Sequence, residues 1–185
     1  MMSDKVLQSK KSDLPIILLG YMGCGKSTIG RLLAKDLALP YIDLDDYLRK
    51  IHGRSVTNLF IEYGEIGFRK LEKTALEDLL VSAQASVLSL GGGTPCYGDN
   101  MQSVIQSTPH TFYLSPSIST LCHRLYSEKD HRPMISHLTS KGKLQEFIAK
   151  HIFERKLYYQ QANHHLYIQD ETPQELVDKI FKELG

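Results

Sequence analysis

The chain has 185 residues, which is enough for one domain with a sizeable hydrophobic core. Its formal net charge of +1 and its scattered basic residues argue against a general nucleic-acid-binding protein, and no segment is apolar over enough length to span a bilayer. The three cysteines lack metal-binding or redox spacing, and their odd number is typical of a reducing cytoplasm rather than a disulfide scaffold. We therefore expect a cytoplasmic protein without nucleic-acid or membrane partners.

The start of the chain, residues 1–12, is polar and lacks the pattern of a signal peptide, so we expect a flexible tail. The apolar run at residues 15–19 has the length of one buried strand. After a glycine-rich segment, Ile29, Leu32 and Leu33 recur at helical spacing. The chain is therefore expected to begin with a strand and a helix joined by a glycine loop.

The glycine loop, Gly20–Ser27, matches the phosphate-loop pattern G-x-x-x-x-G-K-[ST] and has the strand and helix that this motif requires on either side. Its backbone N–H groups and the helix N-terminus can surround phosphate oxygens. Lys26 can reach the β- and γ-phosphates, and the Ser27 hydroxyl can ligate Mg²⁺. The alternative is a turn that only connects strand to helix. The glycines, lysine and serine together favour nucleotide phosphate binding.

Strand and helix patterns alternate along the rest of the chain. A proline and a capping box, Thr172–Glu175, begin the last helix, and Ser55 is the expected N-cap of a helix that Gly64 ends. The alternation predicts a three-layer α/β/α fold with a five-stranded parallel sheet, in one domain over residues 1–185. The further strands are expected at residues 41–43, 86–90, 111–114 and 166–169, and the further helices at 45–51, 55–63, 65–82, 117–126, 144–161 and from 173.

Three polar or glycine-rich segments each follow a predicted strand: the phosphate loop, Asp43 with Asp45, and Gly91–Gly93. Ligands of parallel α/β sheets bind beyond the carboxyl ends of the strands. We therefore expect these segments to converge on one edge of the sheet. Residues 127–143 are polar, irregular and long for a connection, which favours a functional loop.

Each remaining motif has an ordinary explanation when it is taken alone. An aspartate after a strand often caps a helix, and an arginine on a helix is usually solvated. Three consecutive glycines can form only a turn, although they also allow close backbone approach. We therefore interpret these motifs as a set.

As a set, they resemble the shikimate kinase family in order and in spacing, from about residue 16 to residue 162. The phosphate loop is shared by many kinases, and the other motifs are more specific. The resemblance depends on Asp43-Leu44-Asp45-Asp46, Phe68-Arg69, Gly91-Gly92-Gly93, Arg132-Pro133 and Arg155.

The resemblance implies a P-loop kinase fold and transfer of the γ-phosphoryl group of ATP to the 3-hydroxyl of shikimate, in aromatic amino-acid biosynthesis. It also implies a monomer, and a mobile lid at residues 127–143. In this family Ser27 would ligate one Mg²⁺ ion that accompanies ATP, and Asp43 would support the ion through water. The ATP phosphates would be held by Gly23, Cys24, Gly25, Lys26, Ser27 and Thr28.

The resemblance also assigns the acceptor site. Asp45 would accept hydrogen bonds from the shikimate hydroxyls, including the one that attacks. Arg69 and Arg155 would bind the carboxylate, for which the guanidinium fork is suited. The Gly92 backbone would approach the ring, and we expect a larger side chain there to occupy the place of the ring. Arg132 would come from the lid to the phosphates, so that Lys26, Asp45 and Arg132 are the expected catalytic residues.

Asp43 and Asp45 are two residues apart, and we expect them on an extended segment with both side chains on one face. One carboxylate could then meet the acceptor while the other meets the Mg²⁺ shell.

The sequence departs from the family in three places. Cys24 replaces a small residue such as alanine, and Thr94-Pro95-Cys96 follows the glycines where many relatives have Ala-Val. We expect the second change to alter a turn and to leave Gly92 in place. Residues 169–172 lack an arginine that some relatives place against adenine. Arg124 is a candidate to stack on the base, and a solvated helix arginine is an equal alternative.

Two other functions remain open at this point. The first is another small-metabolite P-loop kinase, such as a gluconate kinase, which the glycine triplet and the two arginines oppose. The second is a non-catalytic nucleotide-binding module, which the intact Lys26, Ser27, Asp43 and Asp45 oppose. A nucleoside monophosphate kinase would need a base pocket that the acceptor region does not suggest.

Overall fold

The computed structural model describes residues 13–82, 85–129, 132 and 134–185. The expected tail at residues 1–12 and Pro133 of the Arg-Pro motif lie outside these residues. The described residues form one five-stranded sheet in the order β2-β3-β1-β4-β5, in which every neighbouring pair is parallel. This confirms the predicted parallel sheet. The strands are β1 (Ile16–Leu19), β2 (Tyr41–Asp43), β3 (Val87–Ser89), β4 (Thr111–Pro116) and β5 (His164–Ile168).

The central strand β1 is the core of the sheet. Ile17 pairs with Leu88 of β3 on one side and with Thr111 of β4 on the other. All four residues of β1 are completely buried, as expected for a parallel strand that helices cover on both faces. The carboxyl ends of the strands therefore meet at a single edge of the sheet.

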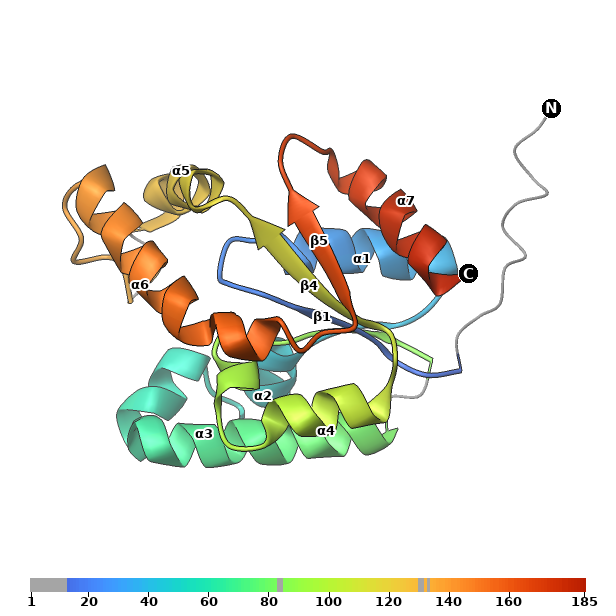
Figure 1. Ribbon diagram of the computed structural model, residues 1–185. Coiled ribbons are helices and arrows are strands. Elements are labelled where there is room, and N and C mark those ends of the chain that lie inside the picture. Colours follow the sequence, from blue (N-terminus) through green and yellow to red (C-terminus); the bar gives the residue numbers. More distant parts are fainter. Residues whose placement is uncertain (1–12, 83–84, 130–131, 133) are drawn as a thin grey trace.

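Helices cover both faces of the sheet and form the two outer layers (Figure 1). Figure 1 shows α1 beside α7 on one side of the strands and α3 beside α4 on the other. The three-layer α/β/α prediction is thus confirmed for the described residues. The α-helices are α1 (Lys26–Leu37), α2 (Leu44–His52), α3 (Val56–Ser82), α4 (Asn100–Ser107), α5 (Ile118–Glu128), α6 (Lys141–Tyr159) and α7 (Pro173–Leu184), and η1 (Thr94–Cys96) is a 3-10 helix.

The predicted helix ends have the expected local chemistry. The Thr172 side chain accepts a hydrogen bond from the Glu175 backbone N–H, and the Glu175 carboxylate accepts one from the Thr172 N–H. The Ser55 hydroxyl accepts from the Asn58 N–H at the start of α3. Gly64 leaves the helical conformation with a φ of 65° and a ψ of 178°, so the predicted break is present as a kink between two helical parts of α3.

Three differences from the prediction concern the loops. Helix α4 was not predicted, because its buried Asn100, Met101 and Val104 alternate with polar residues and give a weak helical pattern. Helix α5 continues to Glu128, and α6 begins at Lys141 after the Ser140 N-cap, so both ends of the expected loop 127–143 are helical. Asp45 lies in the first turn of α2, which agrees with the predicted helix at 45–51 and contradicts the extended segment expected for Asp43 and Asp45. None of the helices in the described ranges is both long and apolar enough to cross a membrane.

Candidate active site

The structure brings the predicted motifs together at the carboxyl edge of the sheet. The phosphate loop follows β1, Asp43 ends β2, and the glycine triplet follows β3. A cavity of about 420 Å³, here the phosphate-loop cavity, is lined by Gly23–Thr28 together with Asp43, Asp45 and Gly92. A neighbouring cavity of about 300 Å³, here the arginine cavity, is lined by Arg69, Arg132 and Arg155 with Asp45, Glu72 and Gly92.

The phosphate loop has the backbone conformation that the motif predicts. Gly25 is the N-cap of α1 with a φ of 106°, a conformation that favours glycine. The Lys26 ammonium donates to the carbonyl oxygens of Gly20, at 2.8 Å, and Tyr21, at 3.1 Å, so it folds over its own loop. Cys24 is 1 % exposed, and its sulfur lies 3.6 Å from the Lys26 ammonium.

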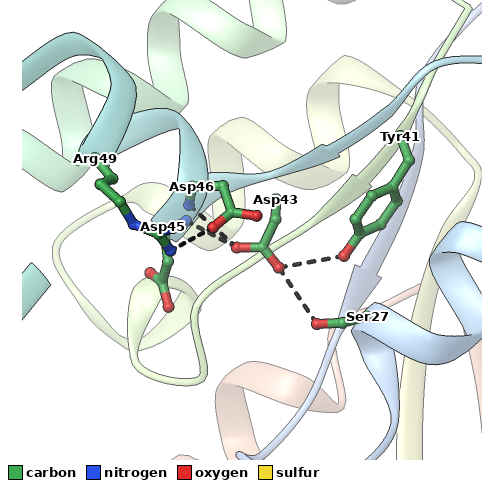
Figure 2. Close-up of polar contacts among 6 residues, drawn as sticks. All are labelled: Ser27, Tyr41, Asp43, Asp45, Asp46 and Arg49. Atoms are coloured by element: carbon green, nitrogen blue, oxygen red, sulfur yellow. Dashed lines mark hydrogen bonds and ion pairs between the residues drawn. The ribbon is translucent and has the colours of Figure 1, made fainter. Parts of the chain in front are cut away.

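Asp43 accepts hydrogen bonds at both of its carboxylate oxygens (Figure 2). Oδ1 accepts from the backbone N–H of Asp45, at 3.0 Å, and of Asp46, at 3.4 Å, and so caps α2. Oδ2 accepts from the Tyr41 hydroxyl, at 3.2 Å, and from the Ser27 hydroxyl, at 3.4 Å. The helix-cap explanation of this aspartate is therefore correct, and the same carboxylate also faces the serine of the phosphate loop. Carboxylate and hydroxyl oxygens are the ligands that Mg²⁺ prefers, so this pair fits such an ion.

The Asp45 carboxylate points away from Asp43 (Figure 2), because Asp45 is already part of helix α2. The prediction that the two side chains share one face of an extended segment is therefore wrong. Burial raises the pKa of Asp45 to about 6, and the negative charges of Asp43 and Glu72 act in the same direction. Lys26 opposes this shift. A carboxylate with a pKa near neutrality is suited to accept a proton.

The arginines of the arginine cavity come from different helices. Arg69, on α3, donates from Nη1 to the buried Glu72 at 2.6 Å, and its guanidinium lies over the rings of Phe60 and Phe68. Arg155, on α6, lies over the Tyr21 ring at 5.6 Å. A Cβ atom on Gly93 would lie 2.5 Å from Arg69 Nη2, so a side chain there would displace the guanidinium.

Gly92 lies against the phosphate loop. A Cβ atom there would lie 3.3 Å from the Met22 nitrogen and 3.5 Å from the Gly20 oxygen. The small residue thus lets the glycine triplet pack against the phosphate loop, and Gly92 also lines both cavities. The Gly92 carbonyl accepts a hydrogen bond from the buried Tyr159 hydroxyl at 2.5 Å, and the sequence had not indicated this contact.

Arg132 lines both cavities and is paired with Glu128, its Nη2 lying 2.6 Å from the carboxylate. Arg124 donates weakly from Nη1 to the Gly23 oxygen at 3.3 Å and lines the phosphate-loop cavity.

The phosphate-loop cavity is also lined by three residues that the sequence analysis missed, Glu171, Pro173 and Leu176. They follow the carboxyl end of β5, so the rule that located the other motifs could have found them.

Comparison with known proteins gives consistent matches. The model of a family described as "Shikimate kinase" matches residues 22–185. A shikimate kinase of Flavobacterium johnsoniae is 42% identical over 165 residues, which cover 89% of this chain and 95% of that protein. The crystal structure of a shikimate kinase from Bacteroides thetaiotaomicron superposes with a TM-score of 0.85 at 33% identity, covering 92% of this chain and 98% of that one. A shikimate kinase from Acinetobacter baumannii in complex with shikimate has a TM-score of 0.82 at 27% identity and 94% coverage of both chains.

Proposed function

The chain belongs to the shikimate kinase family and is an ATP-dependent kinase, and from this premise we propose that it phosphorylates the 3-hydroxyl of shikimate. The products are shikimate 3-phosphate and ADP. The observation that carries the proposal is the arginine cavity, where two carboxylates and three guanidinium groups lie next to a phosphate loop. An anionic polyol fits that combination of charges.

Arg69 and Arg155 bind the substrate carboxylate. Glu72 occupies one edge of the Arg69 guanidinium, and the remaining N–H groups are available to a ligand in the cavity. Arg155 is supported by the Tyr21 ring and contributes the second cation. A planar carboxylate can accept hydrogen bonds from both groups at once.

Asp45 accepts the proton of the attacking hydroxyl. With a pKa of about 6, its carboxylate is largely ionised at neutral pH and still basic enough to help the transfer. The oxygen–phosphorus bond to the acceptor forms as the bond to ADP breaks, and the hydroxyl proton moves to Asp45. Phosphoryl transfer depends mainly on positioning and charge neutralisation, so the remaining residues act on the phosphates.

The backbone of Gly23–Thr28 holds the ATP phosphates, and Lys26 exchanges its contacts with the Gly20 and Tyr21 carbonyls for contacts with phosphate. Arg132 adds positive charge, and Arg124 stacks on the base. Ser27, with Asp43 behind it, would hold Mg²⁺ that arrives with ATP. When bound, this ion neutralises charge on the transferring phosphate.

The segment at residues 127–143 acts as the lid. Both ends of the segment are helical, and most of its described residues between them are exposed, while Ile135 is fully buried and Leu138 packs against the core. Closure excludes water, which would otherwise compete as the acceptor. The proposed protein is a single-domain cytoplasmic monomer of residues 1–185 with ATP and shikimate as its partners, without nucleic acid or membrane.

The test is ADP release in a coupled assay with and without shikimate, with gluconate as a second acceptor. We expect ADP release to depend on shikimate and to be absent with gluconate. Turnover of gluconate instead would support the other small-metabolite kinase. ATP binding without turnover of either acceptor would support the non-catalytic module.

A further inference from the structure

Glu72 is a buried carboxylate at the wall of the arginine cavity. Its side chain is 2 % exposed, and it accepts two hydrogen bonds, one at each oxygen. Oε2 accepts from Arg69 Nη1 at 2.6 Å, and Oε1 accepts from the Thr94 hydroxyl at 2.7 Å. A charge this deep in a protein needs an opposite charge and further hydrogen bonds. The Thr94 hydroxyl is therefore part of what holds the Glu72 carboxylate in place.

Thr94 is itself rigid. It is completely buried and begins η1, directly after the glycine triplet. Its backbone N–H donates to the Gly91 carbonyl at 3.1 Å, and its own carbonyl accepts from the buried Asn100 side chain at 2.9 Å. With the backbone fixed at both ends, the single hydroxyl proton is directed at Glu72.

The Thr94–Glu72 pair also lies against Asp45. A Cβ atom on Gly91 would lie 2.8 Å from Thr94 Oγ1, 3.2 Å from Glu72 Oε1 and 3.3 Å from Asp45 Oδ1. These three oxygens therefore surround one glycine. The pair thus connects the side of the cavity that holds Arg69 with the side that holds Asp45.

We propose that Thr94 is a positioning residue for recognition of the acceptor carboxylate, acting through Glu72 on Arg69. Because Thr94 holds Oε1, Glu72 presents only Oε2 to Arg69 and occupies only one N–H edge of the guanidinium. Without the hydroxyl, Oε1 would lose its donor and would turn to Arg69 as well. A two-oxygen pair with Glu72 would then withdraw N–H groups from the substrate. The inference rests on the proposed function and adds a specificity role to a residue at which the chain departs from the family pattern.

The test compares Thr94→Val, which keeps the shape and removes the hydroxyl, with Thr94→Ser, which keeps the hydroxyl. For Thr94→Val we expect the KM for shikimate to rise roughly tenfold, the effect of one hydrogen bond to a charged group, with kcat and the KM for ATP nearly unchanged. Thr94→Ser should retain the wild-type KM. Thr94→Ala replaces Thr94→Val if the valine variant does not fold, since it adds no atoms to the site.

A substrate analogue without the carboxylate distinguishes a loss of carboxylate recognition from a change in the shape of the site. Shikimate with its carboxylate reduced to an alcohol should inhibit the wild type and Thr94→Val with the same Ki, because it makes no contact that depends on the Arg69 fork. An unchanged KM for shikimate in Thr94→Val, an equal rise in Thr94→Ser, or an equal rise in the Ki of the alcohol would each overturn the inference. If wild-type protein does not turn over shikimate, the proposed function fails first. If Arg69→Lys raises the KM and Thr94→Val does not, only the inference fails.

Discussion

Asp45 carries the pH dependence expected at the level of single residues. Its pKa is raised to about 6 by burial and by the neighbouring Asp43 and Glu72, so it loses its charge within an accessible pH range. We expect kcat/KM for shikimate to be flat above about pH 6.5 and to fall about tenfold per pH unit below about pH 5.5. Asp45→Asn should lower kcat by roughly 10²- to 10⁴-fold.

The matched control for this profile is Asp78→Asn, since Asp78 is an exposed carboxylate on α3 and is not among the charges that shift the pKa of Asp45. Its pH profile should equal that of the wild type. A wild-type profile that stays flat down to pH 5, or a normal kcat in Asp45→Asn, would show that another group accepts the proton.

Arg69 and Arg155 are the residues at which charge and geometry can be separated. A lysine keeps the charge and loses the planar fork, so Arg69→Lys and Arg155→Lys should each raise the KM for shikimate by roughly 10- to 100-fold. The KM for ATP should change little. Steady-state kinetics with either substrate varied gives both values, and Arg49→Lys on exposed α2 is the control. An unaltered KM for shikimate in both variants would remove the carboxylate assignment.

At the level of elements, the junction of β2 and α2 combines a structural and a chemical role. Asp43 caps α2 with Oδ1 and faces Ser27 with Oδ2. Asparagine caps helices as well as aspartate does, so Asp43→Asn should fold normally. It loses the charge behind Ser27, and we expect the Mg²⁺ concentration for half-maximal activity to rise roughly tenfold.

The measurement is a Mg²⁺ titration of activity together with calorimetric binding of Mg²⁺–ATP to the variant. Asp45→Asn is the comparison, because it should lower kcat and keep the Mg²⁺ dependence of the wild type. The opposite pair of phenotypes would mean that the two aspartates have been assigned in reverse.

The connection between α5 and α6 is the second element with a specific prediction. Arg132 is paired with Glu128 and lines both cavities, so it needs only a change of partner to meet phosphate. A ligand shifts such an equilibrium only through contacts that differ between the two states. We expect amide hydrogen exchange across residues 127–143 to slow when an ATP analogue and shikimate bind together.

Arg132→Ala should lower kcat by roughly 100-fold or more, change nucleotide binding less, and leave the fold intact. Lys143→Ala changes an exposed residue of the same segment and should retain wild-type activity. Exchange that is equally slow in the free and the ligand-bound protein would contradict the lid.

At the level of the whole molecule, the same Asp45 carboxylate should reduce stability. Its pKa lies above the ordinary value of 3.8, so the folded state favours the protonated form. Below about pH 4 the group is protonated in both folded and unfolded chains and contributes nothing. Above about pH 6 it is ionised in both, and the burial penalty, of the order of 3 kcal/mol, is fully present.

Asp45→Asn should therefore have a larger free energy of unfolding than the wild type at pH 7.5, and the difference should vanish as the pH falls from 6 to 4. Urea denaturation at several pH values measures it. A variant that is less stable than the wild type at pH 7.5 would show that the carboxylate is held by favourable contacts instead.

The sequence by itself determined the features that depend on neighbouring residues. The phosphate loop, the capping box at Thr172 and the break at Gly64 follow from local backbone requirements, and the apolar runs identify parallel strands. The strand-end rule then correctly predicted that the phosphate loop, Asp43 and the glycine triplet meet at one edge. Local pattern was also where the prediction failed, because α4 is weakly amphipathic.

Only the tertiary structure decided the partners of these residues. Thr94 meets Glu72 across 22 positions of the sequence, and Tyr159 meets Gly92 across 67. Gly92 packs on the phosphate loop, although this contact does not follow from the glycine triplet that contains it. Each of these contacts depends on how the helices pack on the sheet and on which polar groups become buried together. Such packing is set by the whole fold and has no local signature in the chain.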